Sequence, residues 1–254
     1  MSRGARDPGA TLGIGSLSMR ENYAGGVSQY YAQVGATYRN PHFPGVKLVC
    51  YALLNAWWSN ERNRLEGEND LSISVLDLAC GAGEVTICLS EWEQAARAAA
   101  ATSSPSHSHL PPSRQRLRAV AVPERFKLAP IATDPFTGPA FRDRTGLDCL
   151  NLSFEDIANN GLPGDETFEI VFISFALHLV PDSSGLFGLL WNLSTRARFL
   201  AVIGPHKKPE IRDGWGWMRW DPSAWQGVSS SESLRDTVLE RVHLRVYRSL
   251  NVEC

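Results

Sequence analysis

The chain has 254 residues, of which 43% are hydrophobic and 20% charged, and its formal net charge is −2. A chain of this length and composition folds around one well-buried core with room for an insertion, and its near-neutral charge disfavours nucleic acid or an anionic membrane as a partner. No apolar run approaches the ~20 residues that span a bilayer, and the five cysteines show no zinc-ligand spacing, so we expect a cytoplasmic protein with reduced thiols and no metal.

The N-terminal part of the chain is expected to lie outside the main domain. Residues 1–20 contain much glycine, serine and arginine and little apolar surface, which predicts a disordered tail without a secretory signal. Residues 21–65 are expected to form a helical cap or lid of two helices, separated by the prolines of segment 38–44. Residues 66–254 are expected to be one domain with a low-complexity insertion near 98–117.

Apolar runs predict the strands of a sheet in this domain. They lie at residues 71–78, 128–133, 149–152, 168–174 and 199–203. Helices are expected at 84–101 and 185–196, and such alternation indicates parallel strands with helices on both faces. Alternating apolar and charged residues at 239–249 indicate a final antiparallel strand. The predicted fold class is therefore α/β, a Rossmann-like, doubly wound and mostly parallel sheet with an N-terminal helical cap.

A glycine-rich turn follows the first predicted strand, where residues 75–86 read Val-Leu-Asp-Leu-Ala-Cys-Gly-Ala-Gly-Glu-Val-Thr. Its glycines let the backbone turn sharply beside a ligand, and the helix that follows presents free N–H groups. A dinucleotide-binding turn would place a third glycine at Thr86, and Glu84 would repel a pyrophosphate. Together with Asp77 in the strand, this favours a ligand with an amino acid and a sulfonium cation over a nicotinamide cofactor.

The whole string resembles the first motif of class I S-adenosylmethionine-dependent methyltransferases, which implies S-adenosylmethionine as the cofactor. The resemblance implies that the following residues bind it: Asp77, Ala79, Cys80, Gly81 and Gly83 of the turn, Asp134 and Pro135 after the second strand, Phe154, Glu155 and Asp156 after the third, Ser174 and Phe175 after the fourth, and Tyr31 and Arg39 of the cap. Asp134 is implied to bind the ribose hydroxyls, with a turn or helix-cap carboxylate as the alternative. Glu155 or Asp156 is implied to meet the adenine amino group, with a plain helix start as the alternative.

Four residues are candidates for orienting or deprotonating an acceptor: His178, His206, His42 and Tyr38. Histidine suits this role because its ordinary pKa lies near neutrality. The alternative for His178 is a packing or cofactor-edge residue, and for His206 a solvated basic loop. For segment 38–42 the alternative is a plain junction between helices.

Three further strings resemble those of a fungal-type group of methyltransferase-domain proteins. They are YRNPH at 38–42, SFALHL at 174–179 and PHKKPEI at 205–211. The expected function is methyl transfer to a nitrogen or oxygen atom of a small molecule, by a monomer or homodimer that binds neither nucleic acid nor a membrane. The alternatives are a methyltransferase that acts on protein or RNA, and a non-catalytic partner subunit that keeps the fold.

Overall fold

The computed structural model describes residues 35–65, 71–101, 117–205, 208–229 and 234–252. Tyr31, His206, the predicted tail and residues 102–116 of the predicted insertion lie outside these residues. No helix in the described ranges is long and apolar enough to cross a membrane.

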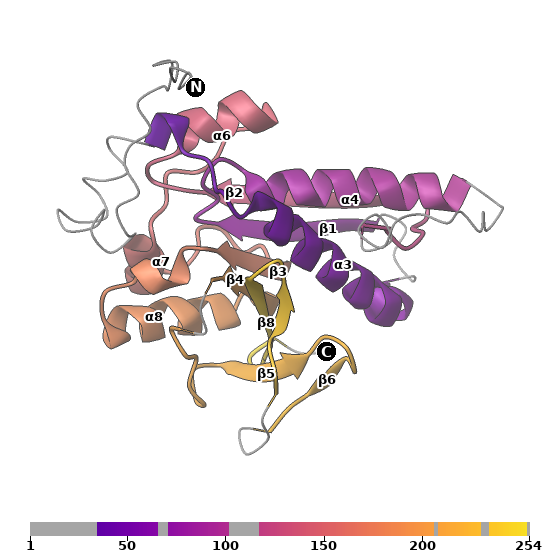
Figure 1. Cartoon of the computed structure of the whole chain (residues 1–254). Helices are drawn as coiled ribbons and strands as arrows, with labels where there is room; N and C mark the ends of the chain where they lie inside the picture. The colour runs from indigo at the N-terminus through magenta and orange to yellow at the C-terminus, as the bar shows by residue number, and fades with distance from the viewer. Residues whose placement is uncertain (1–34, 66–70, 102–116, 206–207, 230–233, 253–254) are drawn as a thin grey trace, which may run out of the picture.

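Within the described residues, an eight-stranded sheet runs in the order β2-β1-β3-β4-β8-β5-β6, with β7 paired to β8 (Figure 1). The strands are β1 (Leu71–Leu78), β2 (Phe126–Thr133), β3 (Phe168–Ser174), β4 (Ala197–Gly204), β5 (Trp217–Asp221), β6 (Gln226–Gly227), β7 (Thr237–Leu239) and β8 (Val242–Ser249). Strands β2, β1, β3 and β4 are parallel, whereas β8 is antiparallel to both β4 and β5. This arrangement confirms the predicted doubly wound, mostly parallel sheet.

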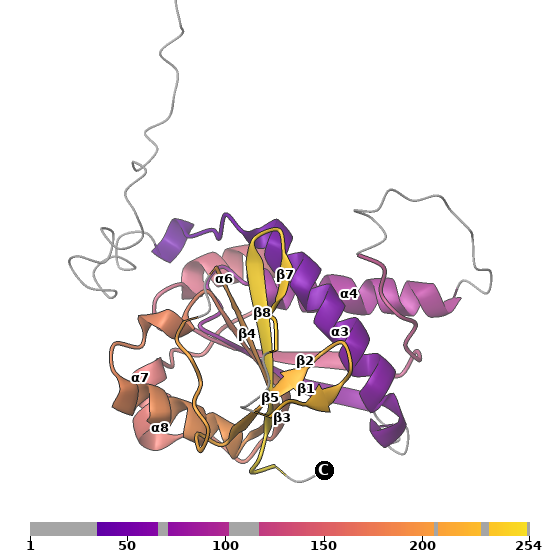
Figure 2. The same cartoon turned by 60° about the horizontal axis from the view of Figure 1, so that its bottom comes forward.

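Helices cover both faces of the sheet, as the two views in Figures 1 and 2 show. The pair α3 (Phe43–Leu65) and α4 (Glu84–Ala101) lies on one face, and the pair α7 (Phe154–Asn160) and α8 (Ser183–Ser194) on the other; α6 (Gly138–Thr145), η1 (Gly35–Thr37) and η2 (Leu177–Leu179) complete the described helices. Successive side chains of a strand point to opposite faces. Accordingly Ile73 and Val75 join the core of α3 and α4, whereas Leu76 and Leu78 join that of α7 and α8.

Two of the predicted strands are wrong in extent. Of the predicted strand at 149–152 only Leu150 pairs, through a single bridge to Thr133. Leu150 is 49% exposed, so this segment buries too little apolar surface to form a longer strand. The predicted strand at 239–249 is a hairpin of β7 and β8, because Glu240 and Arg241 turn the chain with φ of +47° and +63°.

The second proline of segment 38–44 does not interrupt a helix. Pro44 is the second residue of α3, which begins at Phe43. In the first helical turn the backbone N–H has no intrahelical acceptor, so its absence in proline costs nothing there. The described part of the predicted cap, residues 35–65, therefore consists of η1, segment 38–42 and the whole 23-residue helix α3, whose Trp57 is fully buried in the main core.

The strand order determines where a ligand site can form. β1 has β2 on one side and β3 on the other, so the connections that leave β1 and β3 diverge. Such a divergence leaves a crevice at the carboxyl ends of the strands. The glycine turn, Asp134 and Ser174 all lie at these carboxyl ends.

Candidate functional site

A cavity of about 760 Å³ opens at the carboxyl ends of β1, β2 and β3. This volume is typical of sites for small molecules. Ten of the residues predicted from the sequence line it: Tyr38, Ala79, Cys80, Gly81, Asp134, Pro135, Phe154, Glu155, Ser174 and Phe175. The structure thus brings together residues from five separate parts of the chain.

Asp77 and Gly83 do not line the cavity; they hold the glycine turn against α4 and α6. Asp77 Oδ2 accepts hydrogen bonds from the backbone N and the Oγ1 of Thr86, at 3.0 and 2.7 Å, and so ties β1 to α4. A Cβ on Gly83 would lie 2.5 Å from Thr145 Cγ2 and 3.1 Å from Phe141 Cδ2, so this glycine allows α6 to pack tightly against the turn. Both residues are scaffold for the glycine turn.

The carboxyl group of Asp77 is unusual in its ionisation. Its pKa is raised to about 7: burial is the main cause, the hydrogen bonds from Thr86 oppose the rise, and the charges of Glu84 and Asp134 add to it. Its Oδ1 is buried and has no hydrogen-bond partner among the described residues. Three carboxyl groups therefore lie close enough around the turn to influence one another.

The backbone is strained on both sides of the crevice. Ala79, which follows β1, and Phe175, which follows β3, both have φ of +56°, a value that residues with a Cβ rarely adopt. Phe175 is held there by a hydrogen bond from its N–H to the carbonyl oxygen of Ile203, at 2.8 Å. Such strained residues cluster at ligand sites, and both of these line the cavity.

Asp134 is a structural residue as well as a cavity residue. Its Oδ1 accepts from the backbone N–H groups of Phe136 and Thr137, at 2.8 and 2.9 Å, and its Oδ2 accepts from that of Gly81, at 3.1 Å. A carboxylate offers about four acceptor positions. Asp134 is therefore a turn carboxylate, as the alternative has it, and about one acceptor position is left at Oδ2; the ribose contact stays a prediction.

The segment after the Leu150 bridge separates the roles of two neighbouring acids. Asp156 forms a capping box with Ser153: Asp156 N donates to Ser153 Oγ at 3.1 Å, and Ser153 N donates to Asp156 Oδ2 at 2.9 Å. These bonds from Ser153 lower the pKa of Asp156. Glu155 lines the cavity beside Phe154. The helix-start role thus falls to Asp156, whereas Glu155 is the acid of this pair that lines the cavity.

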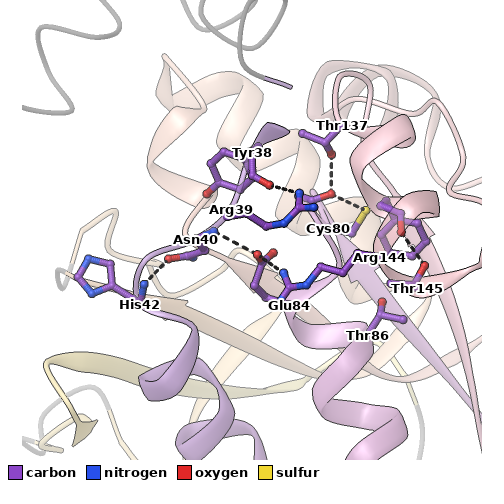
Figure 3. A network of polar contacts seen from close by, with 12 residues as sticks. Tyr38, Arg39, Asn40, His42, Cys80, Glu84, Thr86, Thr137, Arg144 and Thr145 are labelled. Carbon is purple, nitrogen blue, oxygen red and sulfur yellow. Dashed lines mark hydrogen bonds and ion pairs between the residues drawn. The ribbon is translucent and has the colours of Figure 1, made fainter. Parts of the chain in front are cut away.

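Segment 38–42 lies over the glycine turn (Figure 3). A Cβ on Gly81 would be 3.0 Å from Tyr38 Cε1, so the tyrosine ring lies against the turn. Arg39 points elsewhere: it donates to the carbonyl oxygen of Tyr38 at 2.7 Å and forms an exposed ion pair with Asp143 at 3.5 Å. Arg39 does not line the cavity.

The candidate histidines lie at the margin of the cavity or away from it. The His42 ring stacks on Phe175, with ring centres 5.1 Å apart and planes 12° from parallel. His178 lies in η2, is exposed, and does not line the cavity. His206 lies outside the described residues, as Tyr31 does. His42 thus contacts a cavity residue through its ring.

Comparison with known proteins identifies a relative. No family model matches the chain. A protein of Schizosaccharomyces pombe is 41% identical over 242 residues, which cover 92% of this chain and 93% of the yeast protein. This chain belongs to the same family. The yeast protein is named as uncharacterised, so it adds a fungal member to the family and no activity.

Solved structures resemble this family member weakly. A TehB-like S-adenosylmethionine-dependent methyltransferase from Corynebacterium glutamicum is 9% identical with a TM-score of 0.40, covering 91% of this chain and 98% of that one. Magnesium protoporphyrin IX methyltransferase from Synechocystis, with bound S-adenosylmethionine, is 12% identical with a TM-score of 0.41 (94% and 98%). The N-methyltransferase NodS from Bradyrhizobium japonicum, in complex with S-adenosylhomocysteine, is 11% identical with a TM-score of 0.43 (86% and 96%). Scores this low carry no argument, so the fold is assigned from the strand order of the chain itself.

Several lining residues of this family member were not predicted from the sequence. They include Asn40, Glu84, Phe136, Ser153 and Asp182. Glu84 entered the sequence argument only as a group that repels pyrophosphate, and its position as the first residue of the helix was the available signal. Asn40 gave no such signal, because its contact with Glu84 joins positions 44 residues apart.

Proposed function

We propose that this protein transfers the methyl group of S-adenosylmethionine to a nitrogen or oxygen atom of a small molecule. The observation that carries the proposal is the charge of the cavity into which the glycine turn opens. Glu84, Asp134, Glu155 and Asp182 line it, whereas no lysine, arginine or histidine of the described residues does. Such a lining repels a pyrophosphate and suits a ligand that carries a sulfonium and an ammonium group.

The residues present fit this cofactor. Ser174 Oγ is buried at the end of β3 and has no hydrogen-bond partner among the described residues, so a ligand can satisfy it. Asp134 retains about one acceptor position for a ribose hydroxyl. Pro135 and Phe154 offer apolar surface to an adenine ring, and Glu155 offers an acceptor to its amino group.

Bound S-adenosylmethionine supplies a methyl group that is already activated, so the chain has to position an acceptor and exclude water. Tyr38 lies over the turn and lines the cavity, and the His42 ring stacks on Phe175, which also lines it; these contacts support a role for both residues beside an acceptor. We assign these two residues to orienting the acceptor or holding its proton. His178 and His206 remain candidates for the same task.

The size and charge of the cavity support a small acceptor. Its volume of about 760 Å³ suits a cofactor and a small molecule, and its acidic lining disfavours the phosphates of RNA. The four cysteines that the structure describes are free, in accord with the predicted cytoplasmic location. The monomer or homodimer and the boundary between the cap (21–65) and the domain (66–254) remain predictions.

Calorimetric titration tests the cofactor assignment. We expect saturable binding of S-adenosylmethionine and S-adenosylhomocysteine at one site and no binding of NAD; the absence of S-adenosylmethionine binding would overturn the proposal. Incubation with a methyl-labelled cofactor and a fungal cell extract tests the acceptor. We expect label in the small-molecule fraction, whereas label confined to protein or RNA would overturn the acceptor class.

A further inference from the structure

Glu84 joins three segments of the chain at the edge of the cavity (Figure 3). Its Oε1 accepts hydrogen bonds from the backbone N–H of Asn40, at 3.1 Å, and from Arg144 Nη1, at 2.6 Å. The Arg144 guanidinium also lies over the ring of Phe43, 4.7 Å from its centre. One carboxylate oxygen therefore holds segment 38–43 and α6 against the first residue of α4.

The other oxygen of Glu84 has a different environment. Oε2 makes no hydrogen bond or ion pair with any described residue, although the side chain is only 5% exposed and lines the cavity. It lies 3.4 Å from the point that a Cβ on Gly81 would occupy, and Tyr38 Cε1 lies 3.0 Å from the same point. A carboxylate oxygen that no described residue uses is free to accept from a ligand, and the cavity is where a donor can approach it.

The position of Glu84 relative to Asp134 indicates which ligand group comes near it. Asp134 Oδ2 accepts from Gly81 N at 3.1 Å, so the two acids approach Gly81 from different elements, Asp134 from the end of β2 and Glu84 from the start of α4. With the ribose at Asp134 and the adenine toward Phe154, the amino-acid end of the cofactor extends over Gly81 toward Glu84.

The chemistry of that end of the ligand leaves one suitable group. The sulfonium carries no N–H or O–H donor, and the carboxylate of the ligand would be repelled by Glu84. The ammonium group has three donors and a positive charge, and a charge-assisted hydrogen bond is among the stronger ones. Arg144 compensates the charge of Glu84 at Oε1, which allows the carboxylate to remain buried.

Resting on the proposed function, we propose that Glu84 is a specificity-determining residue: Oε2 binds the α-ammonium group of the methionine moiety while Oε1 holds segment 38–42 over the turn. The same carboxylate that secures the cap thereby recognises the amino acid of the cofactor. It also gives the site a preference for this cofactor over nucleotides that lack an α-ammonium group.

The test compares two ligands in two proteins. The ligands are S-adenosylhomocysteine and its analogue in which hydrogen replaces the α-amino group; the proteins are wild type and Glu84→Gln, which keeps an acceptor oxygen for Asn40 N but removes the charge. We expect wild type to bind S-adenosylhomocysteine about tenfold or more tightly than the analogue, and Glu84→Gln to bind the two within about twofold. An equal ratio in both proteins would overturn the inference, even if the variant binds both ligands more weakly.

Two controls separate this role from a purely structural one. Glu91→Gln removes a carboxylate two turns further along α4, which pairs with Lys47 at 2.7 Å and does not line the cavity, and it should keep the wild-type ratio. 5′-Methylthioadenosine, which lacks the amino acid, should lose much less affinity on Glu84→Gln than S-adenosylhomocysteine does; an equal loss for the two ligands would contradict the ammonium contact. Failure of wild type to bind any of these ligands would instead refute the proposed function.

Discussion

Two carboxylates approach Gly81 from different elements, and they are held in different ways. Asp134 accepts from three backbone N–H groups, two of them in its own turn, and so builds the loop at the end of β2. Glu84 accepts from groups 44 and 60 residues away and so assembles the cap. The comparison indicates that the β2 side of the site is fixed mainly by bonds within its own turn, whereas the cap side depends entirely on contacts between distant segments. Substitutions on the first side should therefore affect stability most.

Of the substitutions that test this comparison, Asp134→Ala should have the largest effect on stability and on cofactor affinity. The change leaves the N–H groups of Gly81, Phe136 and Thr137 without their acceptor and removes the proposed ribose contact. We expect the free energy of unfolding to fall by about 3 kcal/mol and the affinity for S-adenosylmethionine by roughly 100-fold or more. Urea unfolding and calorimetry measure the two quantities. Unchanged stability would show that this loop does not depend on the carboxylate.

The next largest effect is expected from Gly83→Ala, on the turn itself. Gly83 has φ of +83°, and a new Cβ would lie 2.5 Å from Thr145 Cγ2. Backbone strain and the clash together should cost about 2–3 kcal/mol in the free energy of unfolding. Gly146→Ala is the matched control, because Gly146 has φ of +72° with nothing within 4 Å and should cost only about 1 kcal/mol. Equal losses in the two variants would mean that α6 does not pack tightly on the turn.

The charges of Glu84 and Asp134 both raise the pKa of Asp77, and the ionisation of Asp77 should make the free energy of unfolding depend on pH. Its pKa is raised from 3.8 to about 7 in the folded chain, so the unfolded chain ionises first as the pH rises, and stability falls until the folded group ionises as well. Between pH 6 and pH 7 wild type should lose on the order of 1 kcal/mol from this residue, and Asp77→Asn should not.

Urea unfolding at the two pH values measures the difference for Asp77. Asp156→Asn is the control, because the pKa of Asp156 is lowered by its bonds from Ser153 and its titration falls at more acidic pH. The same pH dependence in wild type and Asp77→Asn would refute the assignment.

The smallest effect is expected on the cap side, from Asn40→Ala. Asn40 Oδ1 accepts from the backbone N of His42 at 2.9 Å just before α3, whereas its own N–H, which bonds to Glu84, is unaffected by the change. We expect a loss of about 0.5–1 kcal/mol in the free energy of unfolding, together with a cofactor affinity lower by about threefold. Asn60→Ala, an exposed change within α3, should alter neither. A stability loss as large as that of Asp134→Ala would contradict the comparison of the two sides.

Much of the sheet could be predicted because its central strands are buried on both faces. Strands β1 and β3 have the predicted bounds, since a continuous apolar run needs cover on two sides. The strand predicted around Leu150 was wrong because half of that side chain is exposed, which the hydropathy of four residues does not reveal. The β7–β8 hairpin was missed because its turn depends on positive φ at Glu240 and Arg241, neither of them a usual turn residue.

The candidate site could be predicted where its residues are contiguous. The turn from Ala79 to Gly81 lines the cavity as its motif implies, and Asp134 and Ser174 lie there because they end strands of the same sheet. Position in a motif does not distinguish a lining residue from a supporting one, and so Asp77 and Gly83 proved to be scaffold. The network of Asn40, Glu84 and Arg144 was beyond prediction, because it depends on which way α6 and segment 38–42 pack.

The path of α4 has a further consequence for where the length of this chain can change. α4 runs from the glycine turn back to the amino ends of the parallel strands, and β2 starts there with Phe126 paired to Leu71 (Figure 1). The alanine-, serine- and proline-rich stretch between them therefore joins the body of the protein on the side remote from the cavity. We therefore expect additions and deletions between α4 and β2 to leave the spacing of the cavity-lining loops unchanged. For the same reason it is a suitable place to insert an affinity tag or a fluorescent label in the binding experiments.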